Sequence, residues 1–200
     1  MVLYQGGGGN IGDLRQRIDG GRFQLYGILI YSDVDMNFVE FVKNTHKSLA
    51  TMSGEKIFLF WFENFPWDSQ ILWKPGELPA NRKPEITRSE SLKLARSFGI
   101  PMKDTPCILF CKNLEDTEPV VYTFDNKWSN AEMAAHFKEV FDGTEEVLKK
   151  SERVPAFNIH DELVQRFMSI EIKKAARRAV STRSVGDILR AIALGEKLMV

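Results

Sequence analysis

The alternation of apolar and polar positions is clearest in the first third of the chain. Residues 25–31 and 56–63 are two apolar runs of strand length, rich in branched and aromatic side chains. Between them, apolar side chains such as Phe38 and Leu49 recur mostly every three or four residues. That spacing predicts an amphipathic helix, which ends near Ser53. A strand, a helix and a second strand therefore open the predicted fold.

The same pattern continues after an interruption. It predicts a helix over residues 89–97, strands over 107–111 and 119–124, and a helix that begins at Ser129 and reaches Lys150. The complete order is strand, helix, strand, loop, helix, strand, strand, helix. This order is typical of an α/β fold with a mixed sheet.

The interruption is a long loop over residues 64–88. It holds four of the eight prolines, together with Trp67 and Trp73. Loops of this length in compact domains are usually functional or disordered. Exposed aromatic side chains in such a loop would anchor a partner, whereas folded-back ones would only cover the sheet edge. Both interpretations stay open at this point.

We expect a flexible leader over the N-terminal residues 1–22, which contain a run of four glycines. The glycine run Gly6–Gly9 could cradle phosphate only between a strand and a helix, and the sequence predicts no strand before it. No basic patch followed by an apolar run marks a secretory signal. The body of the predicted domain therefore spans residues 23–150.

Residues 151–200 form a predicted helical extension with two amphipathic segments. One covers residues 161–180, and the other covers 184–199, where Ser184 and Asp187 resemble a capping box. Such helices could dock on the body, pair two copies into a homo-oligomer, or bind a partner's groove.

Composition and charge narrow the classes of partner that the chain is expected to bind. The chain has 27 basic and 27 acidic residues, so nothing global attracts nucleic acid or anionic lipid. No stretch approaches the roughly 20 apolar residues of a membrane span. His46, His136 and His160 lie on different predicted elements without metal-ligand spacing. With two cysteines and no export signal, we expect a cytoplasmic protein without a cofactor.

A specific resemblance concerns residues 94–100 and 105–110. Their sequences, Leu-Ala-Arg-Ser-Phe-Gly-Ile and Thr-Pro-Cys-Ile-Leu-Phe, are similar to the helix–glycine–apolar–Thr-Pro–strand signature of the thioredoxin family. The resemblance implies a thioredoxin-like three-layer sandwich with a mixed central sheet, here with a loop insertion and a C-terminal helical extension. It also implies that Pro106 follows a cis peptide bond beside the family's active site, an uncommon bond type.

The active-site turn departs from that family. Thioredoxins place Cys-x-x-Cys where the first core strand meets its helix, because the helix N-terminus stabilises a thiolate. Residues 31–36 contain no cysteine. Cys107 and Cys111 would lie about 13 Å apart along one strand, which exceeds the roughly 7 Å that a disulfide spans. Dithiol–disulfide exchange is therefore not expected.

The preferred hypothesis is a redox-inactive, non-catalytic module that binds a protein or an extended peptide as a scaffold. Thr105 and Pro106 would offer backbone groups to the bound chain. The opposite lip would consist of Ser32, Asp33 and Asp35, and the loop with Trp67 and Trp73 would close over the ligand.

Three alternatives stay open, two of which would make the protein an enzyme. Ser32 could hold glutathione's thiolate, as in some glutathione transferases. Cys107 could act as the single thiol of a peroxidase. Finally, the chain could be a structural subunit of a larger assembly that is docked by its C-terminal helices.

Overall fold

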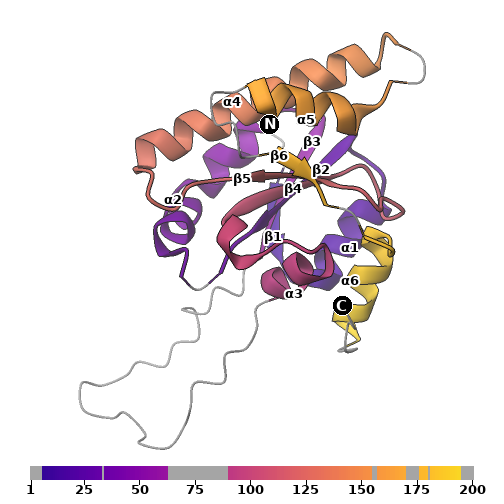
Figure 1. Ribbon diagram of the computed structural model, residues 1–200, viewed down its shortest axis with the longest axis horizontal. Helices are drawn as coiled ribbons and strands as arrows, with labels where there is room; N and C mark the ends of the chain where they lie inside the picture. Colours follow the sequence, from indigo (N-terminus) through magenta and orange to yellow (C-terminus); the bar gives the residue numbers. More distant parts are fainter. Residues whose placement is uncertain are drawn as a thin grey trace, which may run out of the picture.

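The computed structural model describes residues 6–32, 34–62, 90–154, 157–169, 176–179 and 181–194. Within them the chain forms a mixed sheet covered by helices on both faces (Figure 1). The strands are β1 (Gly6–Gly9), β2 (Leu25–Ile30), β3 (Ile57–Phe62), β4 (Cys107–Cys111), β5 (Val120–Thr123) and β6 (Ala176–Arg178). The helices are α1 (Ile11–Asp19), α2 (Met36–Met52), α3 (Glu90–Ser97), η1 (Met102–Asp104, 3₁₀), α4 (Asn130–Ser151), α5 (Ile159–Ser169) and α6 (Val185–Ala193).

The strand order is β1-β3-β2-β4-β5-β6. The pairs β1–β3 and β2–β3 are parallel, whereas β2–β4, β4–β5 and β5–β6 are antiparallel. Helix α4 packs against α2 and α5 on one side of the sheet, and α6 packs against α1 and α3 on the other. The predicted α/β class with a mixed sheet is therefore confirmed.

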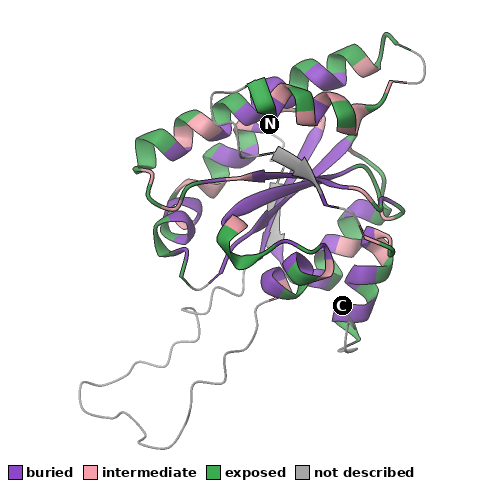
Figure 2. Cartoon of the chain, viewed as in Figure 1, coloured by how far each residue is buried: buried purple, intermediate pink, exposed green. Residues whose placement is uncertain are grey.

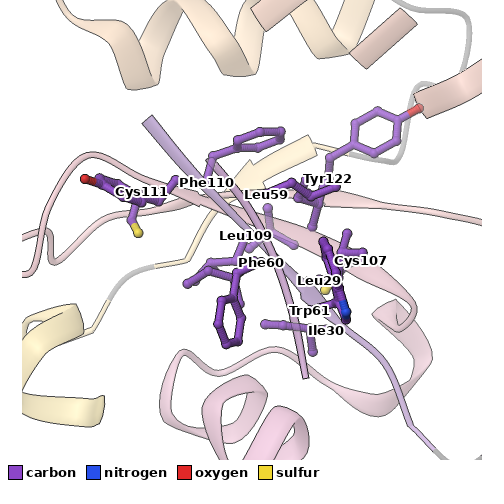
Figure 3. Packing of buried hydrophobic residues seen from close by; sticks show 14 of the residues in the cluster. Leu29, Ile30, Leu59, Phe60, Trp61, Cys107, Leu109, Phe110, Cys111 and Tyr122 are labelled. Carbon is purple, nitrogen blue, oxygen red and sulfur yellow. The ribbon is translucent and has the colours of Figure 1, made fainter. Parts of the chain in front are cut away.

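The four strands β3, β2, β4 and β5 supply the centre of the core. Every residue of β2, β3 and β4 is buried (Figure 2). These strands are continuous apolar runs because helices cover both of their faces. Figure 3 shows Phe110 and Phe60 pointing to opposite sides of the sheet, and Phe110 meets Phe167 of α5 with ring centroids 5.6 Å apart.

The expectation of a leader without regular structure is wrong for Gly6–Asp19. The glycine run is itself β1, paired with β3, and Asn10 caps the helix α1 that follows. The side chain of Asn10 accepts a hydrogen bond from the Asp13 N–H at 3.1 Å. Ile11, Leu14 and Ile18 are buried at helical spacing, a short periodic signal that the glycines obscured.

The C-terminal extension also differs from its prediction. A helix was expected over residues 161–180, but α5 ends at Ser169 and Ala176–Arg178 form β6 instead. This strand forms because the outer edge of β5 offers backbone partners, with Ala176 opposite Tyr122. Ser184 caps α6 as predicted, since its side chain accepts from the Asp187 N–H. The extension thus reaches both faces of the sheet.

Two further expectations concern the loop over residues 64–88 and the absence of a membrane span. The loop over residues 64–88 lies outside the described residues, and so do Trp67 and Trp73. In the part that is described, no helix has the length and apolar character needed to cross a membrane.

Candidate functional site

The register between β2 and β4 brings two of the predicted site segments together. Ile30 lies opposite Cys107 in this antiparallel pair, so the segment that follows β2 and the segment that precedes β4, with Ser32 and Thr105, begin at the same end of the two strands. The Thr105–Pro106 peptide bond is cis, as the resemblance implied. The Pro106 carbonyl accepts a hydrogen bond from the Phe124 N–H at 2.8 Å, which ties the segment before β4 to the segment after β5.

The Ser32–Asp35 turn directs its polar side chains inward. The Ser32 N–H and hydroxyl both donate to Asp35 Oδ2, each at 2.7 Å. The Asp35 N–H donates in return to the Ser32 carbonyl at 3.0 Å. Both residues are buried, so their side chains satisfy each other instead of lining an open lip. Asp33, the third residue predicted here, lies outside the described residues.

Thr105 is likewise partly committed to its own turn. Its N–H donates to the Met102 carbonyl at 3.2 Å, and its hydroxyl donates to the same oxygen at 2.8 Å. The expectation that Thr105 presents its backbone groups to a bound chain is therefore wrong for the N–H. Its carbonyl is the group that an incoming chain could still use.

Three exposed apolar side chains lie on the segments that carry these satisfied polar groups. Val34 and Met36, at the start of α2, are 71% and 57% exposed, and Met102 of η1 is 48% exposed. We call these three residues the apolar rim. Figure 2 shows exposed positions at the start of α2 and at the segment that leads into β4, on the same side of the molecule. Sequence reasoning missed the rim because it concentrated on the polar members of the turn.

A third segment, the β5–α4 loop, belongs to the same site. The Asn126 side chain donates from Nδ2 to the Val34 carbonyl at 3.2 Å. The Asn37 side chain donates to the Asn126 carbonyl, also at 3.2 Å. These two bonds fasten the loop to the turn that carries Val34. Asn126 is 92 residues from Val34 in the chain, so no local pattern could have predicted this pairing.

Tyr31, which precedes Ser32 in the chain, is held by hydrogen bonds of both its backbone and its side chain. The Tyr31 N–H donates to Ser91 Oγ at 2.9 Å, and the Ser91 hydroxyl donates to the Tyr31 carbonyl at 3.0 Å. The Tyr31 hydroxyl donates to the Phe62 carbonyl. Burial raises the pKa of this phenol well above its ordinary value. Tyr31 is therefore a neutral structural donor.

Neither cysteine offers a reactive thiol in this conformation. Cys107 and Cys111 are the first and last residues of β4; both are buried, and neither forms a disulfide. Burial raises the pKa of the Cys111 thiol, and the negative charge of Asp116 raises it further. Nucleophilic thiols need the thiolate and access to substrate.

The three histidines lie on different helices and in separate environments. The ring of His46 lies 5.4 Å from that of Trp61, and the ring of His136 lies 3.9 Å from that of Trp128. His160 Nε2 lies 2.9 Å from Asp116 Oδ2. Among the residues that the structure describes, no group of three or more His, Cys, Asp or Glu could hold a metal ion.

Comparisons with protein-family models, with curated proteins and with solved structures found no match to this chain.

Proposed function

We propose that this protein is a thioredoxin-like module that has no dithiol chemistry and binds a protein partner at the apolar rim. Two observations support the thioredoxin-like part. The elements from β2 to α4 follow the order that the resemblance implies, and the peptide bond before Pro106 is cis. The turn where that family carries its cysteines holds Ser32 and Asp35 instead.

The apolar rim is the observation that carries the binding proposal. Three of the six large apolar side chains that are exposed in the described part belong to it. The turns that carry them are held in place, because Ser32, Asp35 and Thr105 in the same segments are buried and hydrogen-bonded. A cluster of exposed apolar groups on an ordered support is typical of a protein-binding surface.

The rim also suggests how a partner would bind. Methionine is flexible and polarisable, so Met36 and Met102 can adapt to apolar side chains of different shape. The Thr105 carbonyl can accept one backbone hydrogen bond, whereas the Thr105 N–H is already used by Met102. Apolar contacts would therefore supply most of the affinity, and backbone pairing would orient the partner.

The alternatives have less support. The Ser32 hydroxyl donates to Asp35 and is buried, which leaves it poorly placed to hold glutathione's thiolate. Cys107 is buried, which disfavours the single-thiol peroxidase. The apolar faces of α5 and α6 pack within the chain through Leu163, Phe167, Ile188 and Leu189. If these helices docked the chain in a larger assembly, they would have to use their remaining surfaces, because their apolar faces are already buried.

The test uses the double variant Met36→Ser/Met102→Ser. Tagged wild-type and variant proteins are used to capture partners from a native extract, followed by quantitative mass spectrometry and titration of the purified candidate. Met168→Ser is the matched control, because Met168 is 56% exposed but lies on α5, outside the rim. We expect binding to be lost in the double variant and kept in the control. Equal binding by all three proteins would refute the proposal.

A separate assay tests the redox part. The protein should not accelerate the reduction of insulin disulfides by dithiothreitol, because it has no Cys-x-x-Cys and both of its thiols are buried. Acceleration comparable to that of an active thioredoxin would contradict this part of the proposal.

A further inference from the structure

The two outer strands of the sheet differ in composition. In the strand order, β1 and β6 stand at the ends (Figure 1). β6 is three residues long, and two of these residues are Arg177 and Arg178. β1 consists of the four glycines Gly6–Gly9 and carries no charge. Short, charged outer strands resist pairing with another chain, whereas an uncharged strand does not. Of the two edges, the one formed by β1 is therefore better suited to receive a further strand.

Only one edge of β1 is used within the chain. Its four residues pair in parallel with residues 59–62 of β3. Successive residues of a strand direct their backbone groups to alternate edges, so half of the N–H and C=O groups of β1 face away from β3. In the part of the chain that the structure describes, no hydrogen bond reaches that outer edge. β1 thus offers a row of backbone donors and acceptors to an incoming strand.

The glycine composition favours one occupant of this edge. Strand addition gains its affinity from backbone hydrogen bonds and its specificity from pockets for alternate side chains. β1 has no side chains with which to build such pockets, so it would select poorly among foreign peptides. A second copy of β1 brings no side chain that needs space, and glycines in strands often lie where another backbone approaches closely. Because both copies would use the same edge, the pair closes about a twofold axis, the commonest symmetry of homo-oligomers.

The charges of α1 are arranged to suit an antiparallel pair. Helix α1 follows β1 directly and packs against it. Asp13 lies beside the end of the strand, since a Cβ atom at Gly9 would be 2.6 Å from Asp13 Oδ2. Arg17 Cζ lies 5.9 Å from the ring centroid of Phe58, and Phe58 immediately precedes the β3 residue that pairs with Gly6. The acidic side chain is therefore level with the end of β1, and the basic side chain is level with its start.

An antiparallel pair reverses this order in the second copy. Gly9 of one copy then lies toward Gly6 of the other, so Asp13 of each copy comes level with Arg17 of the other. Two pairs of opposite charges would face each other across the twofold axis. Both side chains are exposed, so these pairs add little affinity and are screened by salt. They nevertheless favour the antiparallel orientation.

We propose that the outer edge of β1 pairs antiparallel with β1 of a second copy of this chain, which gives a symmetric homodimer. The two six-stranded sheets then form one continuous sheet. The interface does not involve Val34, Met36 or Met102, so it can fail or succeed independently of the proposed function.

Hydrogen exchange of the full-length wild type tests the interface without any substitution. The outward N–H groups of β1 exchange freely in the monomer and are hydrogen-bonded in the dimer. Peptides that contain residues 6–9 should therefore exchange several-fold more slowly at about 200 µM protein than at about 1 µM. Peptides that cover β6 are the internal control and should exchange equally at both concentrations. A dimer in which the exchange of β1 is unchanged would overturn the proposal.

Analytical ultracentrifugation measures the dimer and its orientation. We expect a reversible monomer–dimer equilibrium at low ionic strength. Arg17→Glu would set a second negative charge against Asp13 of the other copy, so the dissociation constant should rise about 3–10-fold, and added salt should reduce the difference. Lys127→Glu is the control with the same change in charge, because Lys127 is exposed and follows β5, on the other half of the sheet. Equal dissociation constants for the two variants would overturn the antiparallel arrangement.

A purified wild-type chain that stays monomeric at every concentration would overturn the homodimer. If β1 of that monomeric chain became protected only after native extract was added, the occupant of the edge would be a foreign strand, which also contradicts the proposal. The melting temperatures of Arg17→Glu and Lys127→Glu show whether each variant is folded, and the exchange measurement on the wild type decides the matter if either is not.

Discussion

The two ends of strand β4 are treated very differently by the rest of the chain. At the Pro106 end, the protein leaves Val34, Met36 and Met102 exposed around a turn whose polar groups are already satisfied. At the Cys111 end, the β4–β5 turn is covered by the protein's own C-terminal extension. Under the proposed function, the Pro106 end is the one that a partner would bind.

The covered end is held by a dense set of hydrogen bonds. The Asp116 carboxylate accepts from the N–H groups of Lys112 and Glu118 at 3.0 and 3.1 Å, and it lies 2.9 Å from His160 at the start of α5. The Asp116 carbonyl accepts from the Val185 N–H, the first residue of α6, at 2.8 Å. One residue of this turn therefore contacts both helices of the extension, and no comparable contacts cover the rim among the described residues.

The variant with the largest expected effect disrupts the β4–β5 turn, which the C-terminal extension covers. Asp116→Ala removes a buried carboxylate and leaves two N–H groups and His160 without their partner. We expect a loss of about 3 kcal/mol in the free energy of unfolding, measured by urea denaturation. A loss below about 0.5 kcal/mol, the range of ordinary surface substitutions, would show that this turn does not hold the extension.

A second variant tests how closely α6 packs on the β4–β5 turn. A Cβ atom at Gly186 would lie 2.9 Å from Leu114 Cβ and 3.1 Å from the Leu114 carbonyl oxygen. Gly186→Ala should therefore lower the free energy of unfolding by about 1–3 kcal/mol. Gly20→Ala is the matched control, because its nearest contacts would be an ordinary 3.5 and 3.6 Å. Equal stability of the two variants would argue against close packing of α6 on the β4–β5 turn.

The pH dependence of the covered end follows from Asp116. Burial alone would raise the pKa of this carboxyl, but the nearby His160 and the two backbone donors hold it below its ordinary value. A depressed pKa in the folded state contributes stability that is present above the unfolded pKa, near 3.9, and is lost as the pH falls through the folded value. Urea denaturation of wild type and Asp116→Asn should differ most at neutral pH and converge below about pH 4. A difference that is constant with pH would contradict this assignment.

The smallest expected effect on stability concerns the rim. Met36→Ser/Met102→Ser replaces exposed side chains above a support that stays intact, so the free energy of unfolding should change by less than about 0.5 kcal/mol per substitution. The melting temperature relative to Met168→Ser checks this expectation. A large loss would mean that the rim is packed against the chain and is not a free surface.

The strands differ in how well the sequence could predict them. The apolar runs in β2, β3 and β4 are buried on both faces, so composition alone marks them as strands. β1 consists of glycines and carries no hydrophobic signal, and its pairing with β3 could not be read locally. β6 contains two arginines and is a strand because β5 offers an open edge.

The candidate site was predictable only in part. The resemblance around Thr105 and Pro106 located the start of β4, since it depends on a contiguous motif. The inward direction of Ser32 and Asp35 depends on a hydrogen bond that residue types alone do not impose. Asn126 belongs to the site through contacts with residues that are distant in sequence, and such contacts need coordinates.

Site-specific photo-crosslinking tests the central claim most directly. A photoreactive amino acid is placed at Met36 in one protein and at Met168 in another, and each is irradiated in native extract before mass spectrometry of the adducts. The account predicts a defined protein adduct from position 36, which competes with unlabelled wild type but not with Met36→Ser/Met102→Ser, and no such adduct from position 168. The same adduct from both positions, or adducts from position 168 alone, would contradict a partner site at the rim.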